Sequence, residues 1–402
     1  MSVDTAPVAS ATPAPPSPNV PLRSWLAVIA VATATFAMVT VESLPVGLLT
    51  AISGGLGVSP GLAGLTVTLP GLLAAISAPV LPILIRRLDR RLVLLSLLTV
   101  MLAATLTSAL APNFGVLLAS RVFVGIAIGG FWALAASVAV RLVPERHIPR
   151  ATSLAFGGAT AANVLGAPAA TLIGGLTDWR IAFGVVAALG ALVAVALHAL
   201  LPKLPATTTV SPRTLVAQLR NPAVRAAVTA TFLLVGAHWA AFTFISPILQ
   251  QTSGLDATLI GPAQLAFGVA GILGTFVAGS AAARDPRRAL IVAGVLLAAS
   301  LALFPLVGAT PAGGLVLLVV WGLAFGGVPV GVQSWIFKAA PEAAEAATAL
   351  NTSMFNLAIA VGAAVGGVIV SMTGTTGVLW IGAALGVVAG LAVWATGRSL
   401  TR

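Results

Sequence analysis

The chain contains no cysteine and no tyrosine, and only 7% of its 402 residues are charged. The absence of cysteine excludes disulfides and thiolate metal sites. The absence of tyrosine removes a side chain that often contacts sugar rings. Soluble domains carry about 25% charged residues, whereas this chain is 59% hydrophobic. No soluble core of this length buries so much apolar surface, so the composition predicts a polytopic membrane protein.

Other kinds of site are also missing. The three histidines, at 147, 198 and 238, are too far apart in the sequence to suggest a shared metal site. No G-x-x-x-x-G-K-[ST] segment occurs, so ATP is not the expected energy source. The spans do not offer the charge rings of an ion channel. We therefore expect no cofactor, no metal and no enzymatic activity.

Long apolar runs dominate the rest of the chain, and arginine clusters or Pro, Gly and Asn separate them. A helix needs about 20 apolar residues to cross the hydrocarbon layer. The pattern predicts an all-α membrane protein with twelve transmembrane helices. The expected spans are 24–50, 61–85, 92–111, 114–140, 150–174, 181–201, 225–249, 258–283, 289–309, 313–337, 347–371 and 378–397.

The polar segments divide the chain into parts. Residues 1–22 are rich in proline, and we expect a disordered cytoplasmic tail. The tail lacks the basic start of a signal peptide, so the apolar run after it is expected to remain as the first span. The longest polar connection, 202–224, is expected to link an N-terminal six-helix bundle (23–201) to a C-terminal one (225–402).

The basic residues predict the orientation. All but two of the 20 Lys and Arg residues fall on one side of this topology. The exceptions are Arg121, inside a span, and Arg180, on the other side. The positive-inside rule places the basic side and both termini in the cytoplasm, in a cytoplasmic (inner) membrane. The net charge of +11 is thus a topology signal, and we expect the lipid bilayer rather than nucleic acid as partner.

The two halves repeat at a fixed offset. The segment GIAIGG (125–130) recurs as GLAFGG (322–327), 197 positions later. Small residues alone would indicate only close helix packing. The same offset also matches loop residues: Arg90, Arg91 and Pro144 match Arg287, Arg288 and Pro341. Parallel repeats are a transporter architecture, with the substrate site between the halves near the midplane.

Several motifs resemble the major facilitator superfamily, and within it the twelve-span drug:proton antiporters. RVFVG (121–125) resembles the fourth-span motif. NVLGAPAATLIGG (163–175) is similar to the antiporter motif of span five through Gly166 and Pro168, with Ala167 in place of a glycine.

The segment LDRRLVLL (88–95) resembles the tail of the loop motif between spans two and three. Arg86 stands at its acidic position and Pro82 at its leading glycine. The resemblance implies a gating role for this loop and its repeat, through Asp89, Arg90, Arg91, Arg287 and Arg288.

Stretches along nearly the whole chain after the tail resemble the sugar- and nucleoside-efflux branch of that family. Among them are VESLPVGLLT, AFTFISP, WGLAFGGVPVGVQSWI and NLAIAVGAAVGG. The resemblance implies the major facilitator fold and proton-driven export of a small hydroxylated solute such as a nucleoside or sugar. The expected partners are this solute and protons, and the expected state is a monomer. The resemblance does not fix direction, because the same fold imports and exports.

Glu42 is the only acidic residue in the first apolar run. An ionised carboxylate at the bilayer centre costs about 2.5–3.5 kcal/mol, so it neutralises or pairs with a cation. Arg121 is the one cation inside a span, and both residues lie about 12 Å from the same side at 1.5 Å per residue. We predict a direct or water-bridged pair in which proton and substrate binding compete. In the family resembled, the matching acidic residue takes part in both. Alternatively, Glu42 anchors the outer end of the first span.

The repeat offset places His238 and Trp239 opposite Val41 and Glu42. An imidazole titrates near neutral pH, so His238 is a candidate proton relay or hydrogen-bond partner for a solute. A packed histidine is an equally good interpretation. Rings of a solute need flat surfaces and a few polar groups. The candidate substrate contacts are Trp132, Trp239, Gln333, Asn351 and Asn356. Each alternatively serves only packing or interhelical hydrogen bonds, worth about 0.6 kcal/mol on average.

These observations predict a proton-coupled secondary transporter that exports a small polar solute. Three alternatives stay open. An exporter of amphipathic drugs would have a more apolar cavity. An uncoupled facilitator would make Glu42 dispensable. A transporter-like sensor would need a soluble output domain, which neither the short tail nor the central linker provides.

Overall fold

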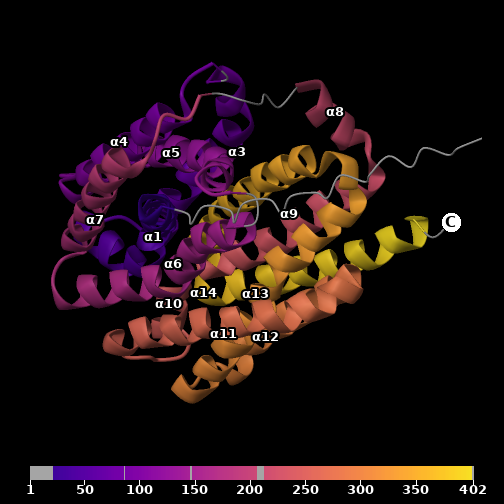
Figure 1. Ribbon diagram of the computed structural model, residues 1–402. Coiled ribbons are helices and arrows are strands. Elements are labelled where there is room, and N and C mark those ends of the chain that lie inside the picture. Colours follow the sequence, from indigo (N-terminus) through magenta and orange to yellow (C-terminus); the bar gives the residue numbers. More distant parts are fainter. Residues whose placement is uncertain (1–20, 86, 145–146, 206–211, 401–402) are drawn as a thin grey trace, which may run out of the picture.

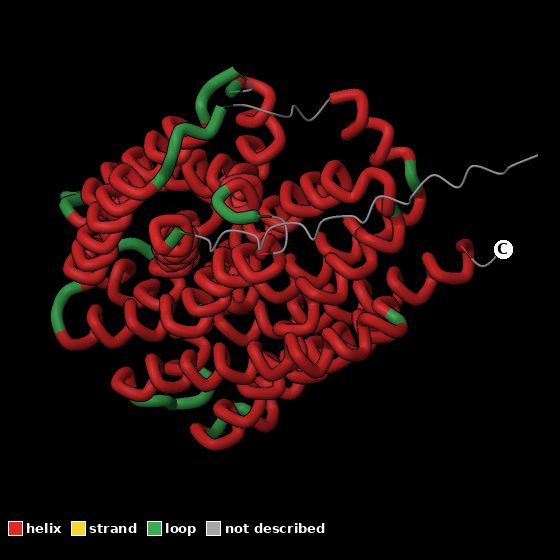
Figure 2. Tube along the Cα trace, viewed as in Figure 1, coloured by secondary structure: helices red, strands yellow, loops and turns green. Residues whose placement is uncertain are grey.

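The computed structural model describes residues 21–85, 87–144, 147–205 and 212–400 (Figure 1). Most of the expected tail (1–22) and the middle of the linker lie outside these residues. Within them every regular element is helical (Figure 2). Figure 1 shows the helices of the first half, indigo to magenta, grouped beside those of the second half, salmon to yellow.

The N-terminal bundle supplies the first six spans. Its second span is interrupted at Gly64, so that α2 and α3 together form it. The helices are α1 (Leu22–Leu56), α2 (Pro60–Ala63), α3 (Leu65–Leu84), α4 (Arg90–Ala109), α5 (Phe114–Arg141), α6 (Ile148–Leu176) and α7 (Trp179–Leu200).

The C-terminal bundle repeats this order. A short helix within the expected linker precedes it, and its first span is interrupted at Thr243 and Phe244. The helices are α8 (Pro212–Arg220), α9 (Pro222–Phe242), α10 (Ile245–Gln251), α11 (Ala257–Arg284), α12 (Pro286–Val307), α13 (Pro311–Ala339) and α14 (Ala344–Leu400), with a 3₁₀ turn at Pro341–Ala343.

The last long helix holds two spans. Eleven helical segments of the described chain are apolar and long enough to cross a membrane, and the last of them, Ala346–Ala395, has 50 residues. Gly374 within it has φ 74° and ψ −169°, a conformation open to glycine but outside the helical region. The chain therefore bends there, and the expected all-α fold with its twelve spans is confirmed.

Two faces can be defined from the chain ends. The basic face is the side where α1 begins and α14 ends, and it includes the turns after α3, α5, α7, α11 and α13. The opposite face holds the turns after α1, α4, α6, α10 and α12, together with Gly374. Four aspartates act as N-caps on helices at these faces, each accepting a backbone N–H: Asp89, Asp178, Asp256 and Asp285.

The repeated glycines bring helices together within each bundle. A Cβ on Gly125 would lie 2.5 Å from the Pro70 carbonyl oxygen of α3. A Cβ on Gly322, its repeat partner, would lie 2.5 Å from the Phe267 carbonyl oxygen of α11. The next repeated pair behaves likewise, since Gly129 faces Ala74 and Gly326 faces Gly271. The small-residue pattern thus packs α5 on α3 and α13 on α11, as expected for such motifs.

Two seams join the bundles. Along one, α2 and α3 lie against the first part of α14. A Cβ on Gly61 of α2 would meet the Gly367 carbonyl, and the Ser353 hydroxyl donates to Ala75 O of α3 at 2.7 Å. Along the other, α6 lies against α11, where a Cβ on Gly268 would come 2.7 Å from Val164 Cα. The second seam involves the halves of α6 and α11 nearest the opposite face.

Substituting Gly326 by valine should lower stability, because added methyl groups would meet the Gly271 backbone. Overpacking of this kind costs about 1–3 kcal/mol. Gly157→Val is the matched control, since nothing lies within 4 Å of a Cβ at that position. Thermal melts of the two purified variants measure the difference. Equal melting temperatures would contradict the packing role of the repeated glycines.

Candidate functional site

Arg121 is fully buried between three helices of the N-terminal bundle. From α5 its Nε donates to the Thr66 carbonyl oxygen of α3 at 3.0 Å, and its Nη2 donates to the Val41 carbonyl oxygen of α1 at 3.1 Å. Its Nη1 has no hydrogen-bond partner in the described part of the chain. A buried cation with a spare donor is costly, so this nitrogen is ready to bind an acceptor.

Glu42 follows Val41 directly on α1, so it sits beside the carbonyl that Arg121 binds. Its side chain keeps partial exposure, whereas both neighbours are buried. The ion pairs among described residues are Arg180–Asp178 and Arg288–Asp285, so the direct form of the Glu42–Arg121 pair is not formed in this conformation. The two charges still interact electrostatically at longer range. The coupling role of the pair stays a prediction.

The C-terminal bundle has a neutral counterpart at the repeat position. His238 of α9, which matches Val41, accepts a hydrogen bond at Nδ1 from Trp321 Nε1–H of α13 at 3.0 Å. In each bundle, then, one donor on the fourth span holds the same position of the first span. Because Nδ1 accepts, the proton of a neutral His238 is on Nε2.

Aromatic rings surround His238. Phe325 stacks on the imidazole with ring centroids 3.4 Å apart, and Phe242 stacks at 4.7 Å. Phe267 and Trp239 complete the cluster at 5.9 and 5.6 Å. His238 is 1% exposed. This environment agrees with the packed interpretation in this conformation, and the relay role of His238 stays a prediction.

The candidate substrate contacts are spread over several helices. Trp239 is buried, and its Nε1–H has no partner in the described chain. Asn351 accepts from the Thr231 hydroxyl at 2.7 Å, and Gln333 donates to Thr348 Oγ1 at 3.0 Å. Both amides thus already link helices within the C-terminal bundle. Trp239 keeps a free donor, which makes it the stronger candidate for a solute.

Two further candidates are less informative. Asn356 donates to the Thr352 carbonyl oxygen of its own helix at 2.9 Å, and it lies where Gly71 of α3 meets α14. Trp132 on α5 is half-buried. The structure does not bring Trp132 into contact with Trp239 through any described ring pair. All substrate roles therefore stay predictions.

The loop-motif residues act within their own bundles. Asp89 caps α4 and accepts the Leu204 N–H at 3.1 Å, while Arg91 donates to the His198 carbonyl oxygen in the last turn of α7. Arg90 is buried and donates to the Ile85 carbonyl oxygen at 3.1 Å. Cations at helix C-termini are favourable for the helix dipole.

The repeat loop is built the same way. Arg287 donates to the Val393 carbonyl oxygen in α14 at 3.2 Å, and Arg288 pairs with Asp285 at 3.1 Å. Both loops thus tie the third span of a bundle to its sixth span or to its own N-cap. A gating role between bundles stays a prediction for these residues.

The span-five motif lies against α1. A Cβ on Gly166 would lie 3.4 Å from Thr40 Cα, and Pro168 lies inside α6. A Cβ on Gly47 of α1 would come 2.5 Å from the carbonyl oxygen of Ala167, the residue that replaces the motif's glycine. The motif therefore brings two backbones together. Its Ala167 is compatible with this role, because the close partner is a carbonyl and not the Ala167 side chain.

A polar bridge crosses between the bundles next to this motif. The Thr171 hydroxyl of α6 lies 2.9 Å from Gln264 Oε1 of α11. Gln264 Nε2 donates to the Ser246 hydroxyl at 3.2 Å, and that hydroxyl lies 3.4 Å from the Val46 carbonyl oxygen of α1. Gln264 and Ser246 are both 2% exposed. These hydrogen bonds join the two bundles in the halves of α6 and α11 nearest the opposite face.

Sequence reasoning did not identify this bridge or the Trp321 donor. Gln264 is detectable as a lone amide in an apolar span, a feature that indicates interhelical bonding. Thr171 and Ser246 give no such signal, because short hydroxyl side chains usually bond to their own helix. The sequence gives no signal that Trp321 is a donor. Its repeat counterpart in the first half is a valine, so the repeat does not point to a polar role.

Comparisons with known proteins agree with this architecture. The sequence pattern of the Major Facilitator Superfamily matches residues 31–358. The chain belongs to this superfamily. It is 36% identical to the purine ribonucleoside efflux pump NepI of Salmonella enteritidis over 344 residues, 86% of this chain and 87% of that protein. The protein of the same name in Salmonella typhimurium is 35% identical over the same shares.

Solved structures share the fold. An inward-facing, occupied bacterial homolog of the human lysosomal transporter Spinster superposes with a TM-score of 0.77 at 15% identity, covering 95% of this chain and 98% of that one. The human organic anion transporter MFSD10 superposes with a TM-score of 0.66 at 18% identity, covering 93% and 100%. The chain is thus a multi-pass secondary transporter of the Major Facilitator Superfamily for a small-molecule substrate, and not an enzyme.

Replacing Gln264 by leucine should shift the protein toward states open at the opposite face. The leucine fits the space but removes the bond to Thr171 across the seam. Because the chain has no cysteine, two spin labels can be attached to one molecule through cysteines introduced at Thr177 and Ala257, both exposed at that face. Pulsed electron paramagnetic resonance should show a larger population of long distances between the two labels. Gln251→Leu, exposed at the same face, is the control, and an unchanged distribution in Gln264→Leu would contradict the bridge.

Proposed function

We propose that this transporter exports a small hydroxylated solute in exchange for protons, with a purine ribonucleoside as the first candidate. The relatives at 36% identity carry that substrate class in their name. We further propose that the basic face is cytoplasmic and that the membrane is the inner membrane of a bacterium. The distribution of arginine and lysine and the bacterial relatives support this orientation.

The observation that carries the proposal is the spare Nη1 donor of Arg121 beside Glu42. An ionised Glu42 carboxylate is the acceptor nearest in sequence to the carbonyl that Arg121 already binds. A solute with hydroxyl or ring-nitrogen acceptors offers the same chemistry. A hydroxyl of the same solute can donate to the ionised Glu42 carboxylate, and a proton on Glu42 removes that acceptor, so proton and solute binding compete.

The cycle follows from this competition. With the cavity open toward the basic face, the solute binds Arg121, and a proton on Glu42 Oε leaves to that side. After the two bundles rock so that the site opens to the opposite face, Glu42 takes up a proton from that face, and the solute departs there. In the solute-bound state the Arg121 cation and the ionised Glu42 carboxylate share the site with a solute that bonds to both, which lowers the cost of burying the two charges. Rocking of the two bundles exposes the site alternately to the two faces.

The Glu42→Gln variant should separate binding from coupling. The amide still fits the site and can donate to or accept from a solute, but it takes up no proton. In proteoliposomes, nucleoside accumulation driven by a proton gradient should fall about 100-fold or more, the contribution typical of a positioned proton-transfer group. Nucleoside exchange without a gradient should persist. Glu342→Gln, an exposed acid at the basic face, is the control and should keep both activities.

A direct assay identifies the substrate. Purified protein in weakly buffered detergent solution, near pH 7, should release protons when adenosine, inosine or guanosine is added, and the Glu42→Gln protein should release none. Release by both proteins would assign the proton to another group, with His238 the next candidate. Binding without release by the wild-type protein would overturn proton exchange and favour an uncoupled facilitator.

A further inference from the structure

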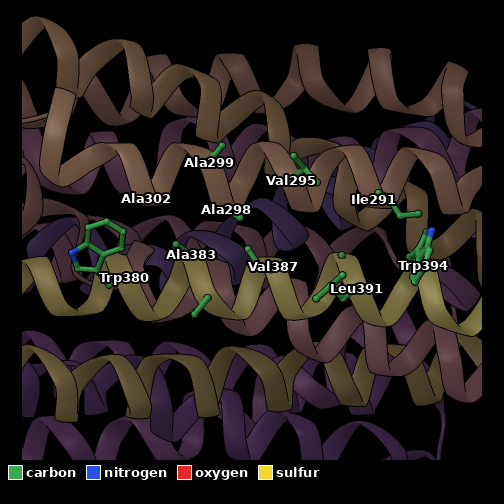
Figure 3. Close-up of a pocket in the computed structure, with 12 residues that line it drawn as sticks. Ile291, Val295, Ala298, Ala299, Ala302, Trp380, Ala383, Val387, Leu391 and Trp394 are labelled. Atoms are coloured by element: carbon green, nitrogen blue, oxygen red, sulfur yellow. The ribbon is translucent and has the colours of Figure 1, made fainter.

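The lipid-facing surface of the C-terminal bundle contains an apolar groove of about 740 Å³ between α12 and the second part of α14. Figure 3 shows its two walls, with Trp380 near Ala302 at one end and Trp394 near Ile291 at the other. The residues between them are small or aliphatic and include Val295, Ala299 and Val387. Nothing in the transport cycle described above uses this groove.

The fold itself does not require the groove, because the repeat-related seam in the N-terminal bundle is closed. There α4 packs on α7 as α12 packs on α14. At the fixed offset, Leu98 is 0% exposed and its counterpart Val295 is 57% exposed. Phe183 is likewise 0% exposed and its counterpart Trp380 is 48% exposed.

One side chain explains much of this difference. Met101 on α4 is buried against α7, where a Cβ on Gly190 would lie 3.5 Å from its methyl group. The counterpart of Met101 is Ala298, which is too short to cross the gap between α12 and α14. The groove is therefore a local property of this sequence.

Cationic side chains lie at the Trp394 end of the groove, on the basic face. Arg287 donates to the carbonyl oxygens of Val393 and Trp394, and its Nε has no partner in the described chain. Arg288 is 87% exposed, and its Nε pairs with Asp285 Oδ2 at 3.1 Å. Its two terminal nitrogens have no described partner. Arg284, also exposed, adds a third positive charge against the one carboxylate of Asp285.

The groove dimensions fit a lipid chain. From Trp394 to Trp380 the helix rises about 21 Å at 1.5 Å per residue. The hydrocarbon layer is about 30 Å thick, so the groove covers the leaflet on the basic face and passes the midplane. Tryptophan favours the two ends of such a path, because its ring is apolar and its N–H is polar.

We propose that this groove is a binding site for an anionic phospholipid. One acyl chain lies between α12 and α14, and the phosphate group binds the exposed Arg288 guanidinium beside the positive charge of Arg287. Basic pockets between membrane helices bind anionic head groups in this way. A zwitterionic lipid would fill the groove equally well but would gain nothing from the net positive charge. A second protein copy would bring its own apolar surface and would not need the arginines.

The test uses purified, delipidated full-length protein in detergent, with phosphatidylglycerol and chain-matched phosphatidylcholine as probes. Native mass spectrometry should show tighter binding of phosphatidylglycerol. Each basic residue near an anionic group contributes about 1 kcal/mol, so Arg288→Gln should weaken that binding about five-fold. Arg91→Gln, the repeat-matched charge change beside the closed seam, should leave it unchanged. Ala299→Phe, which fills the exposed groove, should weaken binding of both lipids.

A second readout reports contact between the lipid chain and the groove directly. Phosphatidylglycerol with brominated chains should quench the fluorescence of Trp380, measured as the difference between the wild-type protein and Trp380→Phe. Equal affinity for both lipids, or binding that Arg288→Gln does not weaken, would overturn the proposal. A concentration-dependent dimer that Ala299→Phe abolishes would assign the groove to a second copy and would also overturn it.

Discussion

The buried Arg121 guanidinium is the interaction on which the N-terminal bundle depends. It joins three helices by donating from α5 to carbonyl groups of α1 and α3. A hydrogen bond from a charged group contributes about 1.5–3 kcal/mol, so losing either carbonyl partner is costly. Burial of the same guanidinium makes the unused Nη1 donor selective for groups that can replace water. The packing of this bundle and the proposed coupling therefore both depend on the Arg121 side chain.

The two bundles solve the same packing problem with different chemistry. The position that Arg121 holds by charge in the first half is held in the second half by the indole of Trp321 bonded to His238. The aromatic cluster around His238 carries no charge, so the second bundle can rearrange without leaving a buried charge unpaired. The first bundle is also closed on its lipid side at α4 and α7, whereas the second is open at α12 and α14. The repeat thus conserves topology while charge and packing density differ between halves.

Much of the architecture could be predicted from the sequence. Apolar runs and their breaks predicted the spans, because the bilayer thickness sets helix length regardless of side-chain detail. The breaks at Gly64 and Thr243 were not predicted, since the apolar pattern continues through them. The tie between Arg121 and the residue before Glu42 agrees with the depth estimate. The direct ion pair was not found here, because backbone carbonyls of Val41 and Thr66 compete for the guanidinium and no sequence pattern reports carbonyl positions.

The Thr171 hydroxyl has one proton but three acceptors within reach. Besides Gln264 across the seam, the carbonyl oxygens of Gly47 and Ala167 lie 3.0 and 2.9 Å away, both in its own bundle. When the bundles separate, the hydroxyl can turn to either carbonyl by rotating a single bond, which takes picoseconds to nanoseconds. Separation of the bundles therefore leaves the Thr171 hydroxyl with a hydrogen-bond acceptor in the N-terminal bundle. Breaking the Thr171–Gln264 hydrogen bond therefore adds little to the activation barrier for opening. Its strength affects the fraction of time that the seam is closed more than the rate at which the seam opens.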